Sequence, residues 1–347
     1  MSQARAYAAA TPTSPLAPTT IPRREPGPLD VSIEIAYAGI CHSDIHTVRG
    51  EWGEGIYPVV PGHEIVGTVT AVGRKVRKFK VGDLAGVGCM VNSCRKCANC
   101  KKGLEQHCSG KVSFTYNSTE PDGKTPTYGG YSSHIVVDEA FVLKVKKGQP
   151  LERVAPLLCA GITTYSPLKR FGAKKGTAVG VLGLGGLGHM AVKIAAAMGA
   201  RVVVLSGSES KRPDAKRLGA KEFVLTKDAA QMAAHAGKLD LIIDTVSGPH
   251  DVNALLNLLT TAGTLVMVGA SPKPHEVSSF GLIMNRRAVA GSLIGGIKET
   301  QEMLDFCAKR KVLSDVEVIA AKDINAAYER VLKSDVRYRF SIDAKTI

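Results

Sequence analysis

The stretch Gly183-Leu-Gly185-Gly186-Leu-Gly188 constrains the fold more than any other part of the sequence. It follows an apolar run directly and opens a segment with helical periodicity, and this strand–turn–helix context strengthens a Gly-x-Gly-x-x-Gly pattern that is weak alone. Apolar runs and helix-length segments alternate around it: strands at 178–182, 201–205, 239–244 and 263–268, helices at 187–198, 211–218 and 251–260. This rhythm predicts a doubly wound parallel sheet that binds a nucleotide.

Each glycine of this loop has a separate predicted role. Gly183 permits the tight turn, Gly185 lets the backbone approach a pyrophosphate, and Gly188 lets helix and strand pack closely. The N–H groups at the start of the helix are donors for the phosphates. With Leu184, Gly186 and Leu187 these residues form the candidate dinucleotide-binding loop.

The end of the second strand indicates which dinucleotide is bound. An NAD site usually has an acidic residue there, but this chain has Ser206, which removes a charge that would repel a 2′-phosphate. Ser208, Lys211 and Arg212 follow as candidate phosphate ligands, so NADP is favoured. Glu209 is the opposing residue, because an inward-turned carboxylate would favour NAD.

Four cysteines lie close together in the sequence, with the spacing Cys-x2-Cys-x2-Cys-x7-Cys: Cys94, Cys97, Cys100 and Cys108. Short loops of this kind place four sulfurs about 3.7 Å apart around one tetrahedral zinc ion. Ferredoxins share the first two spacings, but their pattern continues with x3-Cys-Pro. The spacing therefore predicts a structural zinc site with no open coordination position.

Composition restricts the other classes of function. The chain has 347 residues and a net charge of +14, so a nucleic-acid partner has to be weighed. The basic residues are dispersed and have no aromatic residues interleaved for base stacking, which argues against nucleic acid. No run reaches the ~18 apolar residues of a membrane span, and no signal peptide is recognisable, so a cytoplasmic protein is expected.

A third pattern lies outside the nucleotide-binding region, where 30–147 shows short β-type runs between glycine turns. Cys41 lies in Cys41-His-Ser-Asp-Ile-His46, His63 in Gly62-His-Glu64, and Cys159 in Leu157-Leu-Cys-Ala-Gly161. Two thiols and an imidazole form a Cys2His set that leaves a fourth position for water or substrate. Spacing alone does not bring these residues together across the chain.

These motifs resemble those of the zinc-dependent medium-chain alcohol dehydrogenases, in particular the NADP-dependent cinnamyl alcohol dehydrogenase-like branch. Further marks of that branch are Leu157–Pro167, Gly295–Glu302 and Asp335–Phe340. The resemblance implies an α/β protein with a GroES-like β-barrel catalytic domain (1–157 and 296–347) and a Rossmann NADP-binding domain (158–295). It also implies a homodimer associated through the Rossmann sheets.

By position, the resemblance implies that Cys41, His63 and Cys159 bind a catalytic zinc, with Glu64 as a carboxylate that approaches it. Asp44 would orient the ligating imidazole. Ser43 would exchange a proton with the substrate oxygen, and His46 would end that relay. The alternative is that Ser43 and Asp44 are ordinary turn residues.

The resemblance also implies a substrate pocket and further cofactor contacts. Phe114 stands where plant lignin-pathway members tend to have tryptophan, so a strict preference for bulky methoxylated cinnamaldehydes is not expected. The pocket residues would be Ser43, Trp52, Cys89, Phe114, Met284 and Leu293, and the further cofactor contacts Thr163, Val268 and Ile294.

The sequence thus predicts an enzyme with two zinc ions and NADP(H) that interconverts aldehydes and primary alcohols. One alternative is an NAD-dependent zinc polyol or secondary-alcohol dehydrogenase. A more distant alternative is a zinc-ribbon nucleic-acid-binding protein, which leaves the glycine loop and the Cys2His set unexplained.

Overall fold

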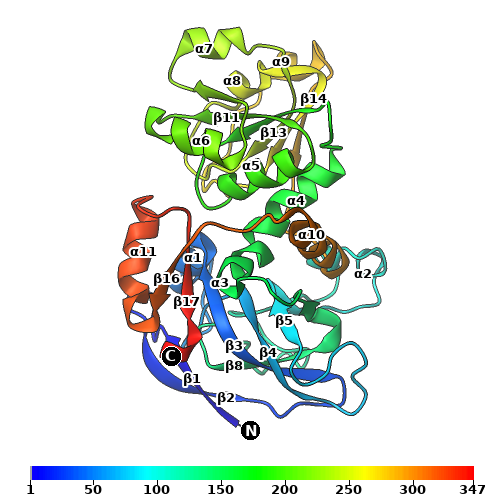
Figure 1. Cartoon of the computed structure of the whole chain (residues 1–347), viewed down its shortest axis with the longest axis vertical. Coiled ribbons are helices and arrows are strands. Elements are labelled where there is room, and N and C mark those ends of the chain that lie inside the picture. Colours follow the sequence, from blue (N-terminus) through cyan, green and yellow to red (C-terminus); the bar gives the residue numbers. More distant parts are fainter. Residues whose placement is uncertain (1) are drawn as a thin grey trace. The chain divides into compact units, whose positions relative to one another are not determined.

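The computed structural model describes residues 2–347, which divide into two compact units. Unit 1 runs up to Cys159 and resumes with Gly295–Ile347, and unit 2 is Ala160–Ile294. Both ends of the chain therefore contribute to unit 1 (Figure 1).

Unit 1 is built on a seven-stranded sheet with the order β16-β17-β3-β4-β5-β9, in which β8 also pairs with β3. Val31, Ile33 and Ile35 are buried while Glu34 between them is exposed, the alternation of a strand with one face on the core. The strands are β3 (Asp30–Ile40), β4 (Ile65–Val72), β5 (Leu84–Val87), β8 (His134–Asp138), β9 (Leu143–Lys144), β16 (Val316–Ala320) and β17 (Arg339–Asp343).

Smaller elements surround this sheet. The proline-rich N-terminal region is extended, as its six prolines predict, and β1 (Ser2–Ala8) and β2 (Ala17–Arg23) pair as an antiparallel hairpin. A second two-stranded ribbon joins β6 (Met90–Asn92) to β7 (Ser113–Phe114). The helices of unit 1 are α1 (His42–Val48), α2 (Ala98–Lys101), α3 (Leu151–Val154), α10 (Ile297–Arg310) and α11 (Ile324–Leu332).

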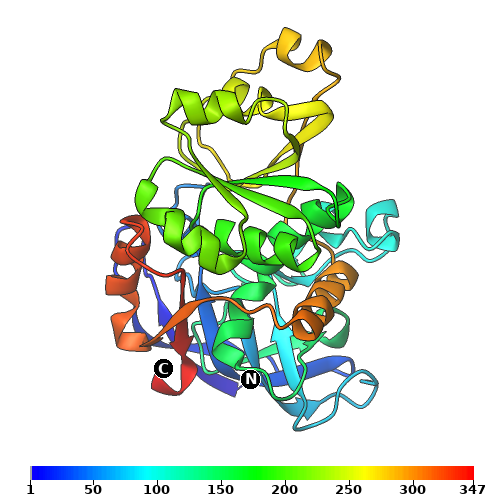
Figure 2. The ribbon, with the colours of Figure 1, turned by 45° about the horizontal axis from the view of Figure 1, so that its top comes forward.

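Unit 2 confirms the predicted doubly wound sheet. Six parallel strands have the order β12-β11-β10-β13-β14-β15, so the direction of strand progression reverses between β10 and β13. Helices α5 and α6 lie on one face of the sheet and α7 and α8 on the other (Figure 2). The strands are β10 (Ala178–Leu182), β11 (Arg201–Ser206), β12 (Glu222–Leu225), β13 (Leu239–Asp244), β14 (Leu259–Met267) and β15 (Ala288–Gly291), and the helices α4 (Ala160–Arg170), α5 (Gly188–Ala197), α6 (Arg212–Leu218), α7 (Ala229–Ala234), α8 (Val252–Leu256) and α9 (Ser279–Ile283).

The helix expected over 251–260 is wrong in its second half. Asp251 caps the helix by accepting from the N–H groups of Asn253 and Ala254, but α8 ends at Leu256. The chain then enters β14, where Leu259 pairs with Leu239 of β13 and is fully buried. This pairing with a distant strand overrides the local helical pattern, and β14 starts earlier than predicted.

Within residues 2–347, we find no helix that has both the length and the apolar character of a membrane span.

Candidate functional site

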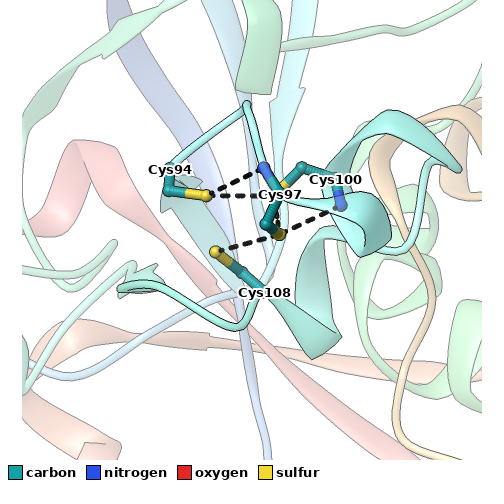
Figure 3. Close-up of side chains that lie close together, drawn as sticks. All are labelled: Cys94, Cys97, Cys100 and Cys108. Carbon is teal, nitrogen blue, oxygen red and sulfur yellow. Dashed lines mark hydrogen bonds between the residues drawn. The ribbon is translucent and has the colours of Figure 1, made fainter.

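The four clustered cysteines converge in unit 1, in the loop that follows β6 and around α2 (Figure 3). The Sγ atom of Cys97 lies 3.5 Å from that of Cys100 and 3.9 Å from that of Cys108, and Cys94 Sγ lies 3.9 Å from Cys100 Sγ. These are the sulfur–sulfur separations that a tetrahedral zinc with Zn–S bonds of about 2.3 Å imposes. The cluster therefore fits a closed, structural zinc site.

The backbone supports thiolates in this cluster. The N–H of Cys100 donates to Cys97 Sγ over 3.5 Å, and the N–H of Cys97 donates to Cys94 Sγ over 3.4 Å. The Cys100 N–H is the leading cause that lowers the pKa of Cys97 to about 5. Zinc binds the deprotonated thiol, so this N–H favours the form of Cys97 that a metal requires, whereas burial raises the pKa of Cys100 to about 11.

A second donor cluster in unit 1 joins three distant segments of the chain. Cys41 follows β3 and caps α1, His63 and Glu64 precede β4, and Cys159 ends a 3-10 turn at Ala155–Leu158. All four residues are buried, and one donor atom from each lies within 4.8 Å of the others. The Sγ atoms of Cys41 and Cys159 are 3.9 Å apart. Two thiols, an imidazole and a carboxylate fit a zinc site with an exchangeable position.

Glu64 is held at this cluster by a buried ion pair. Arg339, the first residue of β17, donates through Nη2 to Glu64 Oε1, while Oε2 of Glu64 has no hydrogen-bond partner among the described residues. Burial raises the pKa of Glu64 to about 8, although Arg339 acts in the opposite direction. The carboxylate packs over Gly39, where any Cβ would overlap Oε2. An unsatisfied buried carboxylate oxygen beside two thiols is chemically suited to a metal ion.

Asp44 fixes the imidazole of the cluster. Its Oδ1 accepts from Nδ1 of His63 over 3.0 Å and from the N–H of Gly62 over 3.1 Å. With Nδ1 carrying the proton, Nε2 of His63 is the nitrogen left for a metal. Asp44 is fully buried, and its contact with His63 argues against the alternative that it is an ordinary turn residue.

Ser43 and His46 lie on α1 beside this cluster, three residues apart and therefore on one helix face. Ser43 Oγ is 3.6 Å from Cys41 Sγ, so its hydroxyl lies next to a metal donor. The imidazole of His46 pairs through Nδ1 with Glu51 and stacks on Trp52 with 4.9 Å between ring centroids. The relay role of Ser43 and His46 stays a prediction, for which a hydroxyl beside the metal donors is the supporting observation.

The predicted pocket residues are divided between the two units. Cys89 Sγ lies 3.9 Å from the carbonyl oxygen of Leu158, next to Cys159, and is therefore at the metal cluster. Trp52 and Phe114 expose much of their side chains on unit 1. Met284 and Leu293 belong to unit 2, where both are exposed, and their assignment to the pocket stays a prediction.

In unit 2 the glycine loop joins β10 to α5, and three of its glycines differ in what surrounds them. Gly183 has φ +86°, a conformation that favours glycine. A Cβ at Gly188 would overlap the carbonyl oxygen of Gly183, so close packing requires glycine there. A Cβ at Gly185 would meet no atom within 4 Å. The fold itself therefore leaves room for a side chain at Gly185, and a close approach by the predicted pyrophosphate would be the reason for glycine there.

The loop after β11 contains the residues predicted to distinguish NADP from NAD. Ser206 Oγ accepts from the N–H of Ser208 over 3.2 Å, and the hydroxyls of Ser208 and Ser210 are 2.9 Å apart. Glu209 forms a two-point ion pair with Arg212, whose guanidinium lies 4.5 Å above the ring centroid of Phe223. The Glu209 carboxylate, which would favour NAD if it turned inward, is therefore paired with the Arg212 guanidinium.

The remaining predicted cofactor residues also lie in unit 2. Thr163 is in α4 and buried, and its hydroxyl has no hydrogen-bond partner among the described residues. Val268 and Ile294 follow β14 and β15, at the carboxyl edge of the sheet. Ligands of doubly wound sheets bind at that edge.

Comparison with known proteins explains this combination of sites. Residues 27–147 match the family model of the alcohol dehydrogenase GroES-like domain, and residues 186–309 match that of the zinc-binding dehydrogenases. The chain is 57% identical to NADP-dependent alcohol dehydrogenase C 1 of Mycolicibacterium smegmatis over 100% of this chain and 99% of that protein. This chain belongs to the zinc-binding alcohol dehydrogenase family.

Other members of the family are similar to this chain along nearly its full length. The chain is 55% identical to the aldehyde reductase YahK of Escherichia coli, over 99% of both proteins. Its fold matches a cinnamyl alcohol dehydrogenase of Sorghum bicolor with a TM-score of 0.96 and 46% identity, over 99% of this chain and 98% of the other. A second solved structure, from Helicobacter pylori in complex with NADP(H), gives a TM-score of 0.92 and 49% identity over the same shares.

Three features of the site were missed by the sequence analysis. Arg339 pairs with Glu64, which is 275 residues away in the sequence, and Tyr131 donates to Asp44, which is 87 residues away. At such separations the spacing of residues in the sequence does not predict a contact. His189 is fully buried, and its Nδ1 lies 2.8 Å from the carbonyl oxygen of Gly186 in the glycine loop. Its position in the first turn of α5, after the glycine loop, was the only available signal.

Proposed function

We propose that this family member is an NADP(H)-dependent alcohol dehydrogenase that reversibly reduces aldehydes to primary alcohols. The observation that carries the proposal is the buried cluster of Cys41, His63, Glu64 and Cys159 with the Ser43 hydroxyl beside it. The names of its relatives, an NADP-dependent alcohol dehydrogenase and an aldehyde reductase, support the same reaction.

The residues divide the chemistry between them. Zinc, when bound, supplies a Lewis acid for the carbonyl oxygen, and the nicotinamide supplies the hydride. Cys41, His63 and Cys159 hold the metal, and Asp44 keeps the imidazole of His63 in one orientation. The Ser43 hydroxyl delivers the proton to the substrate oxygen, because a hydroxyl donates and accepts at the same time. His46, paired with Glu51, is the outer end of that relay.

We assign the cofactor as NADP(H) from the loop after β11. The end of this strand carries Ser206 instead of an acidic residue, and Ser208 and Lys211 follow as phosphate ligands. Glu209 does not favour NAD here, because its carboxylate is paired with Arg212. The polyol dehydrogenase alternative is disfavoured by the same loop and by the four-cysteine cluster, and nothing in the structure favours a nucleic-acid-binding protein.

The Ser206→Asp variant tests the cofactor assignment. A carboxylate facing a 2′-phosphate is expected to lower kcat/KM for NADPH about 100-fold, since like-charge juxtaposition costs several kcal/mol and each ~1.4 kcal/mol is a factor of ten. Activity with NADH should be retained or improved. Ser206→Ala, which adds no charge, is the control. Equal losses with the two cofactors would contradict the placement of the 2′-phosphate at this loop.

Initial rates test the reaction itself. Cinnamaldehyde, benzaldehyde and a short aliphatic aldehyde are each supplied with NADPH, and the alcohol produced is quantified against the NADPH consumed. Equal amounts of alcohol and NADP⁺ are expected with at least one aldehyde. The order of the three rates then reports the width of the pocket. Failure of all three aldehydes in a protein that contains both zinc ions would reject the proposed reaction.

We further propose that the protein is a homodimer formed through unit 2. Strand β15 ends the six-stranded sheet, with no neighbour on its outer side among the described residues. Nearby in sequence, Phe280, Ile283 and Met284 expose 75%, 69% and 72% of their surface. A second copy would cover both an open strand edge and this apolar group. Sedimentation equilibrium should give twice the 36.7 kDa chain mass, and a monomer at micromolar concentration would reject the dimer.

A cytoplasmic location is proposed from the chemistry of the cysteines. All eight cysteines are free thiols, and seven lie in or beside the two metal clusters. A reducing compartment keeps such ligands available for zinc.

A further inference from the structure

The Asp44 carboxylate is the centre of a hydrogen-bond network behind the metal cluster. Its Oδ1 accepts from His63 and Gly62, as described above. Its Oδ2 accepts from the N–H of Cys41 over 2.9 Å and from the hydroxyl of Tyr131 over 3.2 Å. Three of the four donors lie on a metal-binding residue or directly before one. Tyr131 is the exception, because it comes from a different segment and ligates nothing.

Tyr131 is fixed against the segment that carries His63. The backbone N–H of Tyr131 donates to the carbonyl of Pro61 over 3.0 Å, and that of Gly130 to the carbonyl of Gly62 over 2.8 Å. Gly62 has φ +104°, and a Cβ there would come within 2.6 Å of the Tyr131 ring. The glycine before His63 is thus required by the tyrosine ring as well as by its own backbone conformation. The ring has no exposed surface.

A second tyrosine continues the network. The hydroxyl of Tyr328, on α11, donates to the Tyr131 oxygen over 3.5 Å, and the two rings are 6.5 Å apart. Burial is the leading cause that raises the pKa of Tyr131 well above its ordinary value, so its hydroxyl keeps its proton. The hydrogen bonds therefore have defined directions. Tyr328 donates to Tyr131, and Tyr131 donates to Asp44. Asp44 also accepts a hydrogen bond from Nδ1 of His63.

We propose that Tyr131 is a positioning residue for the catalytic metal, which holds the Asp44 carboxylate in the plane that orients His63. Without the phenol, Oδ2 would lose the hydroxyl donor that lies opposite the N–H of Cys41, at a carboxylate that has no exposed surface. A carboxylate with an unmet acceptor rotates or shifts, and the imidazole that depends on it loses its fixed orientation. The effect reaches the metal through His63 and not through any contact of Tyr131 with substrate.

The Tyr131→Phe variant tests this role, because it removes one oxygen and leaves the ring against Gly62. Partners of a ligating histidine typically change metal affinity about 10–100-fold. Tyr131 is one step further out, so we expect the zinc dissociation constant of the Cys41–His63–Cys159 cluster to rise about tenfold. Competition with a chromophoric chelator measures it. Cobalt substituted at this cluster should show altered d–d absorption, which reports the ligand geometry directly.

Two further variants separate positioning from general stability. Tyr57→Phe removes the phenol oxygen of a partly buried tyrosine, whose hydroxyl donates to the carbonyl of Val48 over 2.8 Å, and should leave both readouts unchanged. Tyr328→Phe should give a smaller change of the same sign as Tyr131→Phe. The four-cysteine site should keep its zinc in every variant, which shows that unit 1 remains folded. An unchanged dissociation constant and an unchanged cobalt spectrum in Tyr131→Phe would overturn the proposal.

The role of Tyr131 rests on the proposed function in one respect, namely that the cluster of Cys41, His63 and Cys159 binds zinc. If the wild-type chain binds zinc at the cluster but reduces no aldehyde, the proposed reaction fails while the Tyr131 comparison remains valid. If aldehyde reduction is confirmed and Tyr131→Phe binds zinc like the wild type, only the role of Tyr131 is rejected.

Discussion

Replacement of Cys159 by serine is expected to remove the catalytic zinc and to reduce turnover by about 10³-fold or more. The variant exchanges a thiolate for a neutral hydroxyl at a buried cluster, where Cys41 and Cys159 supply both sulfurs. A Lewis-acid metal contributes several kcal/mol to the transition state, and each ~1.4 kcal/mol is a factor of ten in rate. Zinc per chain should fall from two to one.

A second cysteine variant provides the control for this experiment. Cys307 is also fully buried, but its thiol contacts Met303 Sδ at 3.7 Å and belongs to neither metal cluster. Cys307→Ser should therefore retain two zinc ions and full turnover. If Cys159→Ser kept both zinc ions and wild-type activity, the ligand assignment would be wrong.

The Gly185→Ala variant is expected to weaken NADPH binding about 100-fold while leaving the stability of the cofactor-free protein unchanged. Apart from its chain neighbours, no described residue has an atom within 4 Å of a Cβ at this position, and the backbone conformation is not the left-handed one that favours glycine. The methyl group would instead occupy space needed by the pyrophosphate, and misplacement by about 1 Å can cost 10²-fold. Binding is measured by calorimetry and stability by thermal unfolding.

The neighbouring glycine should behave in the opposite way. A Cβ at Gly188 overlaps the carbonyl oxygen of Gly183, so Gly188→Ala should destabilise unit 2 even without cofactor. Unchanged NADPH affinity in Gly185→Ala would mean that the pyrophosphate does not approach this backbone. The two variants together distinguish a glycine required by the ligand from one required by the fold.

The sequence predicted local features well, because their causes are local. The spacing of Cys94, Cys97, Cys100 and Cys108 determines sulfur separations almost without reference to the rest of the fold, and the observed separations are 3.5–3.9 Å. The glycine loop likewise needs only one strand and one helix. In both cases the residues that act together lie in one short segment of the chain.

The convergence of Cys41, His63 and Cys159 could be predicted only from the family resemblance. These residues meet because β3 pairs with β4 and because the turn at Ala155–Leu158 packs beneath both strands, contacts between segments far apart in the chain. Arg339 and Tyr131 were missed for the same reason. Arg339 reaches the cluster through the pairing of β17 with β3, and Tyr131 through loop hydrogen bonds to the segment before His63, and no short-range pattern encodes either contact.

The helix expected over 251–260 shows the same limit within unit 2. Its first half is helical as predicted, with Asp251 as the cap, but Leu259 pairs with β13 and the end of the predicted helix is strand. The hydrophobic residues that suggested one helix face are buried in two different elements.

The central claim is zinc-dependent hydride transfer from NADPH to an aldehyde carbon. The most direct measurement uses NADPH deuterated at C4 of the nicotinamide, with the preparation of the enzyme that contains two zinc ions and with one stripped at the Cys41–His63–Cys159 cluster alone. We predict one deuterium on the carbinol carbon of the product with the first preparation and no turnover with the second, restored when zinc is added back. Deuterium absent from that carbon, or full turnover without the cluster's zinc, would contradict the account.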